Sequence, residues 1–195
     1  MITNTANMLT LFRIAIIPVL IVLFFFPGPV AAWSAVGLFV LAAITDFFDG
    51  YFARSLNQVT AFGRFLDPIA DKLIVTVTLF LLVAFDRLEG LWILPAVIIL
   101  VREILIAGLR EFLGPYNIKV KVSPLAKWKT TVQLIVISFL IAGPYGDLVI
   151  PYANMIGHYG LIIAMILTVI TGWDYLKAGL NAIQKIDSGN GDAVK

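Results

Sequence analysis

Four aspartates lie inside or beside long apolar runs of this sequence: Asp46, Asp49, Asp67 and Asp71. Residues three or four positions apart share one face of a helix, so Asp46 pairs with Asp49 and Asp67 pairs with Asp71. One aspartate at the centre of a membrane helix costs about 2.5–3.5 kcal/mol, so four together need an offsetting partner. Two such faces turned toward each other would repel and bind protons unless cations lie between them. An all-oxygen donor set favours Mg²⁺, Mn²⁺ or Ca²⁺ over Zn²⁺, and two such ions can clamp the attacking and leaving oxygens of a phosphoryl transfer.

The composition indicates a protein with several membrane-spanning segments. Of the 195 residues, 61% are hydrophobic and only 13% are charged, whereas a soluble domain carries about 25% charged residues. The absence of cysteine from the sequence excludes disulfides, thiolate catalysis and cysteine-bound metals. A net charge of +2 is too small to indicate nucleic-acid binding. We therefore expect any chemistry to occur in the membrane-embedded part or at its surface.

The apolar stretches predict an all-α integral membrane protein with six transmembrane helices. A span needs about 20 mostly apolar residues, and the candidate spans are residues 10–26, 32–54, 62–85, 91–112, 124–142 and 159–182. Residues 1–9 are too short and polar to cross, so we expect them to form a short N-terminal interfacial amphipathic helix. The prediction is a single membrane-embedded domain over residues 1–185, followed by a disordered tail over residues 186–195 that is rich in Gly, Asp and Ser.

The basic residues predict how these spans are oriented. Arginines and lysines flank the second and fourth loops and the C-terminal end, whereas the other loops hold only Arg87. The positive-inside rule then places both termini in the cytoplasm, with the chain crossing the cell (plasma) membrane several times. The four aspartates end the second span and begin the third, so we expect their site to face the cytoplasm.

Small residues occur where these two helices are expected to converge. Gly50, Ala53 and Gly63 would let two backbones approach closely, or would leave room for a flat ligand such as a base. Arg54 follows at once and could pair with a phosphate, or it could simply anchor its helix at the interface. The aspartates could likewise be helix caps that pair with neighbouring basic residues, but acids inside a membrane are functional by default.

Three basic residues occur on the same predicted side of the membrane: Arg110, Lys127 and Lys129. They could receive an anionic second substrate, or they could only obey the positive-inside rule. For Arg102 beside Glu103, the adjacent opposite charges favour an internal ion pair.

The aspartate motif carries a resemblance to a known family. The pattern D-x-x-D-G-x-x-A-R, eight residues, G-x-x-x-D-x-x-x-D, which runs from Asp46 to Asp71, resembles the CDP-alcohol phosphotransferase signature at every fixed position. The segment from Asn7 to Arg13 is similar to the family's N-terminal N-x-L-T-x-x-R segment, with Ala6 where proline is frequent. Residues 102–111 and 120–130 resemble the phosphatidylglycerophosphate synthase branch, with Ala126 where that branch usually has glycine.

The resemblance implies a reaction and a role for each of these residues. An acceptor hydroxyl would attack the β-phosphorus of CDP-diacylglycerol and release CMP, and in this branch glycerol 3-phosphate is the acceptor and phosphatidylglycerol phosphate the product. The four aspartates would bind two divalent cations, Mg²⁺ or Mn²⁺, and Asp71 would also act as general base. The protein would be a homodimer in the lipid bilayer. The implied CDP-binding residues are Asn7, Thr10, Gly50, Ala53, Arg54 and Gly63, and the implied acceptor phosphate-binding residues are Arg110, Lys127 and Lys129.

Other functions stay open at this point. The same chemistry could use another acceptor, such as phosphatidylglycerol, serine or inositol phosphate. An ion-coupled membrane transporter would use the aspartates to carry protons or divalent cations, but it predicts acids near the middle of the membrane rather than at one side. A non-catalytic nucleotide- or lipid-binding relative is disfavoured because Asp71 is intact.

Overall fold

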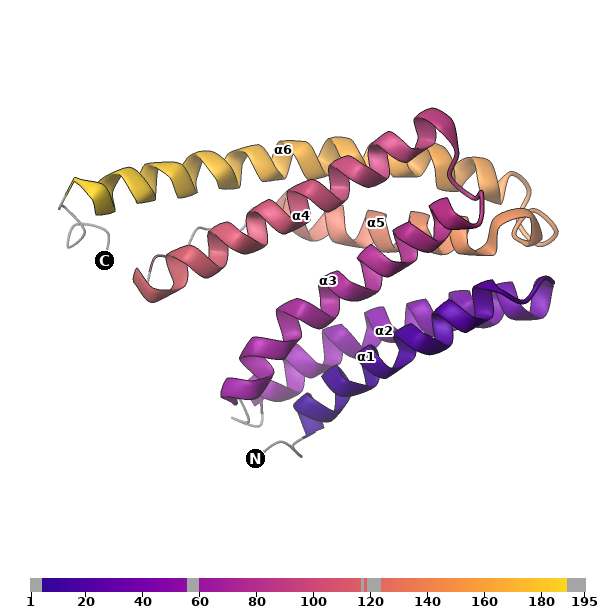
Figure 1. The fold of residues 1–195 in the computed structure, drawn as a ribbon, viewed down its shortest axis with the longest axis horizontal. Coiled ribbons are helices and arrows are strands. Elements are labelled where there is room, and N and C mark those ends of the chain that lie inside the picture. The colour runs from indigo at the N-terminus through magenta and orange to yellow at the C-terminus, as the bar shows by residue number, and fades with distance from the viewer. Residues whose placement is uncertain (1–4, 56–59, 117, 119–123, 189–195) are drawn as a thin grey trace. The chain divides into compact units, whose positions relative to one another are not determined.

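The structure is a computed structural model that describes residues 5–55, 60–116, 118 and 124–188. Within these ranges, only the backbone is described for residues 5, 6, 47–55, 61, 64, 127 and 187. Every regular element in the described part is a helix, which confirms the all-α prediction. The long helices are α1 (Thr5–Phe24), α2 (Pro29–Ser55), α3 (Ala61–Ala84), α4 (Ile93–Leu113), α5 (Pro124–Ala142) and α6 (Ala153–Asp187) (Figure 1). Short 3₁₀ helices precede or follow them: η1 (Gly90–Trp92), η2 (Gly114–Tyr116) and η3 (Gly143–Tyr145).

Two predicted boundaries at the ends of the chain are corrected. Residues 5–9 do not form a separate interfacial helix, because they continue directly into α1. Neither glycine nor proline occurs before Pro18, so nothing in the sequence breaks the helix between these residues and the first span. At the other end, Ile186 and Asp187 belong to α6 and not to a tail. Residues 1–4 and 189–195 lie outside the described part.

Five of the described helices are long and apolar enough to cross a membrane: α1, α2, α4, α5 and α6. The sixth predicted span, α3, has the required length but carries four charged residues in its first half. These are Arg64, Asp67, Asp71 and Lys72. The same charged residues that could take part in chemistry therefore make α3 less apolar than the other long helices.

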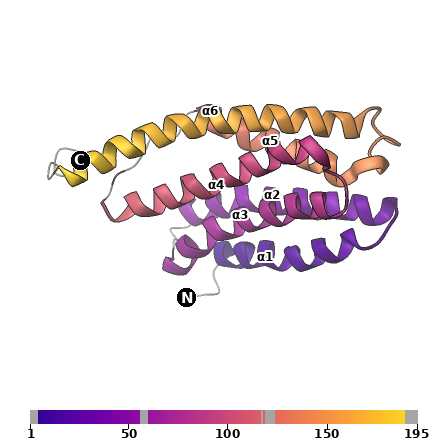
Figure 2. The same cartoon turned by 45° about the horizontal axis from the view of Figure 1, so that its top comes forward.

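The chain forms two compact units. Unit 1 contains residues 1–93 and 134–159, and here α1 packs along both α2 and α3 (Figure 2). Gly28 has a φ of +121°, which a glycine adopts without strain, and Pro29 then begins α2 with a suitable φ. This short turn sends α2 back along α1. The apolar core between the helices includes Leu20, Phe39 and Leu82, each at most 1% exposed.

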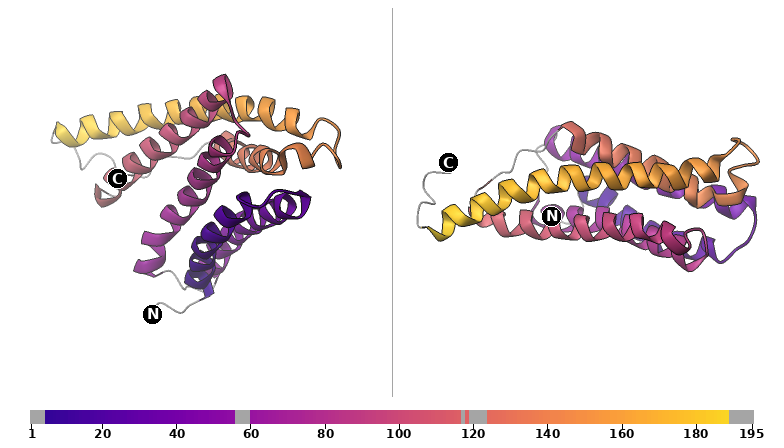
Figure 3. Two further views of the ribbon diagram at one scale, coloured as in Figure 1. Left: turned by 45° about the vertical axis from the view of Figure 1, so that its right-hand side comes forward. Right: turned by 90° about the horizontal axis from the view of Figure 1, so that it is seen from above.

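Unit 2 contains residues 94–133 and 160–195. The helix α4 lies against α6 in this unit, as two contacts at glycines of α6 show (Figure 3). At Gly172, a Cβ atom would lie 2.8 Å from Cγ of Arg102, and at Gly179 it would overlap the side chain of Leu109. Small residues on α6 therefore let α4 approach closely, as is common between membrane helices.

Candidate active site

One face of α1 is polar and buried, which is unusual for a helix with so apolar a sequence. Asn7, Thr10 and Arg13 follow one another at intervals of three residues and so point to the same side. Their exposed fractions are only 2%, 1% and 1%. Buried polar groups need partners, and these three find them at the end of α2 and the beginning of α3.

Arg13 is the centre of the cluster. Its Nη1 donates to Oδ1 of Asp46 at 2.6 Å and also to Oδ1 of Asp71, while its Nη2 lies 4.0 Å from Oδ1 of Asp67. The three carboxylates thus come from two helices and meet around one guanidinium. Their side chains are 43–47% exposed, whereas Arg13 is 1% exposed. The protein supplies positive charge on the buried side of the cluster and leaves its other side accessible.

The remaining polar residues of α1 fix the first turn of α3. Thr10 donates its hydroxyl to Oδ1 of Asp67 at 2.5 Å. The Thr60 hydroxyl donates to Oδ1 of Asn7 at 3.0 Å and accepts from the backbone N–H of Gly63 at 3.0 Å, which makes Thr60 the N-cap of α3. A Cβ atom on Gly63 would lie 2.7 Å from Oδ1 of Asn7. Gly63 thus has a close neighbour, but this neighbour is the Asn7 side chain of α1, whereas the sequence predicted an approach between α2 and α3.

A second buried charge cluster lies in unit 2. The carboxylate of Glu103 on α4 accepts from Arg102 at 3.0 Å and from Lys129 on α5, which is only 5% exposed. Arg102 reaches further to the Thr171 hydroxyl of α6 at 3.2 Å. The internal pair predicted for Arg102 and Glu103 is confirmed. Counted over the described side chains, this cluster joins three helices through two cations and one anion.

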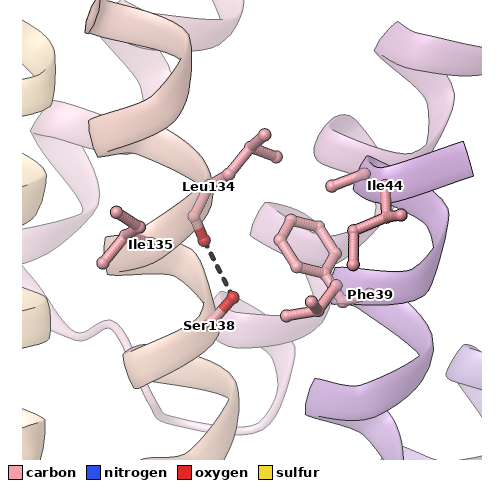
Figure 4. Close-up of a pocket in the computed structure, with 7 residues that line it drawn as sticks. Phe39, Ile44, Leu134, Ile135 and Ser138 are labelled. Carbon is pink, nitrogen blue, oxygen red and sulfur yellow. Dashed lines mark hydrogen bonds between the residues drawn. The ribbon is translucent and has the colours of Figure 1, made fainter. Parts of the chain in front are cut away.

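An apolar groove of about 380 Å³ lies in unit 1 between α2 and α5 (Figure 4). Phe39, Ala43 and Ile44 line it from α2, and Leu134 and Ser138 are among the residues that line it from α5. The hydroxyl of Ser138 donates to the Leu134 carbonyl of its own helix at 2.9 Å, so it offers little polarity to the groove. Ile44 precedes Asp46 by two residues. The groove therefore reaches α2 within one turn of the aspartate cluster.

Comparison with known proteins decides the family. The family model for CDP-alcohol phosphatidyltransferase matches residues 3–173, which includes every polar residue of both clusters. This chain belongs to that family.

Curated relatives of this family member match over nearly their whole length. A protein from Rickettsia bellii is 47% identical over 175 residues, which cover 90% of this chain and 94% of the relative. Proteins from Cereibacter sphaeroides and Bacillus subtilis are 39% and 37% identical, and the matches cover 89% and 93% of this chain and 94% and 97% of the relatives. All three are named CDP-diacylglycerol–glycerol-3-phosphate 3-phosphatidyltransferase.

The predicted metal ligands of this phosphatidyltransferase-family chain are partly described. Asp46, Asp67 and Asp71 are brought together by Arg13, whereas the side chain of Asp49 lies outside the described residues. Among the described side chains, no three acidic or histidine groups stand at metal-ligand spacing. The donor set still fits a divalent cation, because it consists of partly exposed carboxylate oxygens from two adjoining helices. Asp49, three residues after Asp46 on α2, would complete it.

The predicted substrate contacts fall into two groups. Asn7, Thr10 and Gly63 lie beside the aspartates, and CDP binding at them stays a prediction. For Gly50, Ala53, Arg54 and Lys127 only the backbone is described, so their part in substrate binding stays a prediction.

Of the predicted acceptor residues, Lys129 is buried and paired with Glu103, whereas Arg110 is exposed and lies 5.9 Å from the ring centroid of Tyr175. The two residues thus have different partners, and acceptor binding at them stays a prediction.

The sequence alone does not predict the role of Arg13. It also does not predict that Glu103 pairs with Lys129. A signal for Arg13 was present, since it continues the three-residue spacing of Asn7 and Thr10 and is a cation within an apolar helix. For Glu103 the partner on another helix, Lys129, is 26 positions away, and no local pattern joins the two.

Proposed function

We propose that this protein transfers the phosphatidyl group of CDP-diacylglycerol to glycerol 3-phosphate, which gives phosphatidylglycerol phosphate and CMP. The proposal rests on one observation above all: the aspartates of the family signature converge from α2 and α3 into a partly exposed cluster. The names of relatives that are 37–47% identical over most of the chain support the choice of both substrates.

In the proposed reaction, Asp71 acts as general base. It accepts the proton of the acceptor hydroxyl as the oxygen forms a bond to the β-phosphorus, and the bond from this phosphorus to the bridging oxygen breaks. CMP leaves with that electron pair. Asp46, Asp49, Asp67 and Asp71 would hold two divalent cations, Mg²⁺ or Mn²⁺, whose charge would stabilise the pyrophosphate oxygens. The exposed fraction of 43% leaves Asp71 accessible to an acceptor.

We assign the acceptor phosphate to Arg110, Lys127 and Lys129. The cluster around Glu103 supports this assignment because it holds two cations and one anion and so keeps a surplus positive charge. Such a surplus in a partly buried site attracts a phosphate strongly. An acceptor without a phosphate, such as serine, would have no use for it.

The groove between α2 and α5 is assigned to an acyl chain of CDP-diacylglycerol. Its lining is apolar, and its lining residue Ile44 precedes Asp46 by two positions on α2, near the place where the diphosphate would lie. Ala43→Trp fills the groove and should lower the rate with long-chain substrate about tenfold more than with a dihexanoyl substrate. Leu41→Trp, on the same helix but not in the lining, is the matched control. Equal losses with both chain lengths would argue against this occupant.

The remaining parts of the proposal concern the membrane. All six long helices would cross the cell membrane, with α3 carrying its charged residues at the cytoplasmic end. Both termini and the site would then face the cytoplasm, as the distribution of arginine and lysine favours. We also propose a homodimer, which cross-linking in vesicles would test.

The decisive experiment measures CMP release by the purified protein from CDP-diacylglycerol with Mg²⁺. The expected result is release that requires glycerol 3-phosphate and stops when a chelator is added. Release that requires phosphatidylglycerol, serine or inositol phosphate instead would keep the reaction and overturn the acceptor. A protein that folds and binds divalent cations but releases no CMP with any acceptor would favour the transporter hypothesis, which uptake into proteoliposomes then tests.

A further inference from the structure

The proposed reaction assigns no step to Arg13, although this residue donates to carboxylates of both α2 and α3. The guanidinium lies between Asp46 and Asp71 and 4.0 Å from Asp67. It comes from α1, whereas the carboxylates come from α2 and α3, so a single side chain joins these three helices. With an exposed fraction of 1%, it is among the largest fully buried side chains of the described residues.

Three carboxylates this close together would repel one another without a positive charge among them. A guanidinium is suited to the task because it stays charged in a protein and carries several N–H donors in a fixed plane. Arg13 uses Nη1 for Asp46 and Asp71, so both carboxylates turn one oxygen toward the buried side. The charge that holds them there has the same sign as a metal ion.

We propose that Arg13 is the internal counter-ion of the aspartate cluster. It stabilises the packing of α1 on α2 and α3 and, by the same charge, weakens the binding of divalent cations to these aspartates. The inference deepens the proposed function, because it takes the aspartates as the ligands of those cations. It also gives a reason for an arginine in an apolar helix that otherwise has no charged residue.

Two effects of opposite sign follow when the charge is removed. Without Arg13, the carboxylates repel across the interface, so the protein without divalent cations becomes less stable. The same cluster is then more negative and has carboxylate oxygens released from the guanidinium, so it binds a cation more tightly. A residue that only clamped the ligands into place would behave differently, because its loss would lower both stability and metal affinity.

The test compares the full-length protein with Arg13→Gln in detergent, by thermal unfolding and by Mn²⁺ titration monitored by electron paramagnetic resonance. In a chelator, the melting temperature of the variant should fall by about 10 °C. Its affinity for Mn²⁺ should rise about tenfold, and saturating Mn²⁺ should recover most of the lost melting temperature. Lys185→Gln, which removes an exposed positive charge at the end of α6, should change neither quantity.

A fall in Mn²⁺ affinity, or no change, in Arg13→Gln would overturn the inference. A parent protein that bound no Mn²⁺ would overturn the proposed metal site as well, so the two failures are distinguishable. Arg13→Lys covers the case in which the glutamine variant does not fold. It keeps the charge, so its Mn²⁺ affinity should stay within about threefold of the parent value, and a tenfold loss would show that the guanidinium geometry, not the charge, is what matters.

Discussion

Each of the two units of this protein holds a charge cluster around a residue whose charge is opposite to that of the others, and the clusters have opposite signs. In unit 1, Arg13 contacts Asp46 and Asp71 and lies 4.0 Å from Asp67. In unit 2, the anion Glu103 contacts Arg102 and Lys129 among the described side chains. Both clusters join three helices. In each cluster one residue has the opposite charge to the rest, Arg13 in unit 1 and Glu103 in unit 2, and we call its charge the minority charge. This residue contacts the oppositely charged members of its cluster.

The two clusters differ in their net charge, which we call the surplus. One arginine among three aspartates leaves a negative surplus, which suits divalent cations. One glutamate between an arginine and a lysine leaves a positive surplus, which suits a phosphate. The comparison teaches that the minority charge maintains the packing of the helices, whereas the surplus determines which ligand the cluster attracts. Both halves of this statement can be tested by changing one residue at a time.

The largest effect on activity is expected when the negative charge of Asp71, the proposed general base in unit 1, is removed. Asp71→Asn removes the proposed general base and one ligand oxygen, and it should lower CMP release by about 10²–10⁴-fold. The melting temperature should change little, because the variant also removes one of the mutually repelling charges. Asp174→Asn, an exposed aspartate of α6, is the control and should keep full activity. If Asp71→Asn retained more than a tenth of the parent rate, the base would have to be another residue.

Removing the minority charge of unit 2 should affect stability more than any other single change there. Glu103→Gln keeps the shape of the side chain but leaves Arg102 and Lys129 near each other with no anion between them. The expected cost is about 3 kcal/mol, or a fall of about 6–12 °C in melting temperature. Glu111→Gln, an exposed glutamate of the same helix, should shift the melting temperature by less than about 2 °C. A larger loss at Glu111 than at Glu103 would refute the assigned role of the buried cluster.

The sequence predicted one kind of feature well and another kind poorly. Residues that depend on local spacing were placed correctly: Asp67 and Asp71 share a face of α3, and Asp46 faces them from α2. The helices were also found, because apolar stretches of about 20 residues are a strong local signal. The pair Arg102–Glu103 was predicted from adjacency alone.

The features that the sequence did not predict depend on contacts between distant helices. Lys129 was predicted as a phosphate ligand from its charge, but its partner Glu103 is set by how α4 and α5 pack. The role of Arg13 likewise needs the approach of α1 to both α2 and α3. The predicted N-terminal boundary is wrong for a third reason: a polar segment suggests that the membrane helix has not yet begun, but the polar residues on one face of α1 are buried against partners.

An intermediate effect on stability and on acceptor binding is expected when the surplus positive charge of unit 2 is removed and Glu103 is kept. Lys129→Gln leaves Glu103 paired with Arg102 at 3.0 Å, so the melting temperature should fall less than in Glu103→Gln. The surplus positive charge is lost, so the KM for glycerol 3-phosphate should rise about tenfold while kcat changes less. Steady-state kinetics with varied glycerol 3-phosphate separates the two constants. An unchanged KM would mean that this cluster only holds the helices together.

The smallest change in melting temperature is expected from a variant that tests whether close packing at Gly63 is needed beside the charge cluster of unit 1. In Gly63→Ala the new Cβ would lie 2.7 Å from Oδ1 of Asn7 and 3.2 Å from Oγ1 of Thr60, so the N-cap of α3 must shift. Overpacking costs about 1–3 kcal/mol, and the higher helix propensity of alanine returns up to about 1 kcal/mol. In Gly37→Ala in α2, the new Cβ would have no described heavy atom within 4 Å apart from its chain neighbours and the nearby backbone of its own helix, so the variant should gain stability from propensity alone. Opposite signs in the two melting shifts would show that the space beside Gly63 is required by Asn7. A stabilised Gly63→Ala would mean that the contact between α1 and α3 yields easily, and the cluster around Arg13 would then depend on charge rather than on close packing.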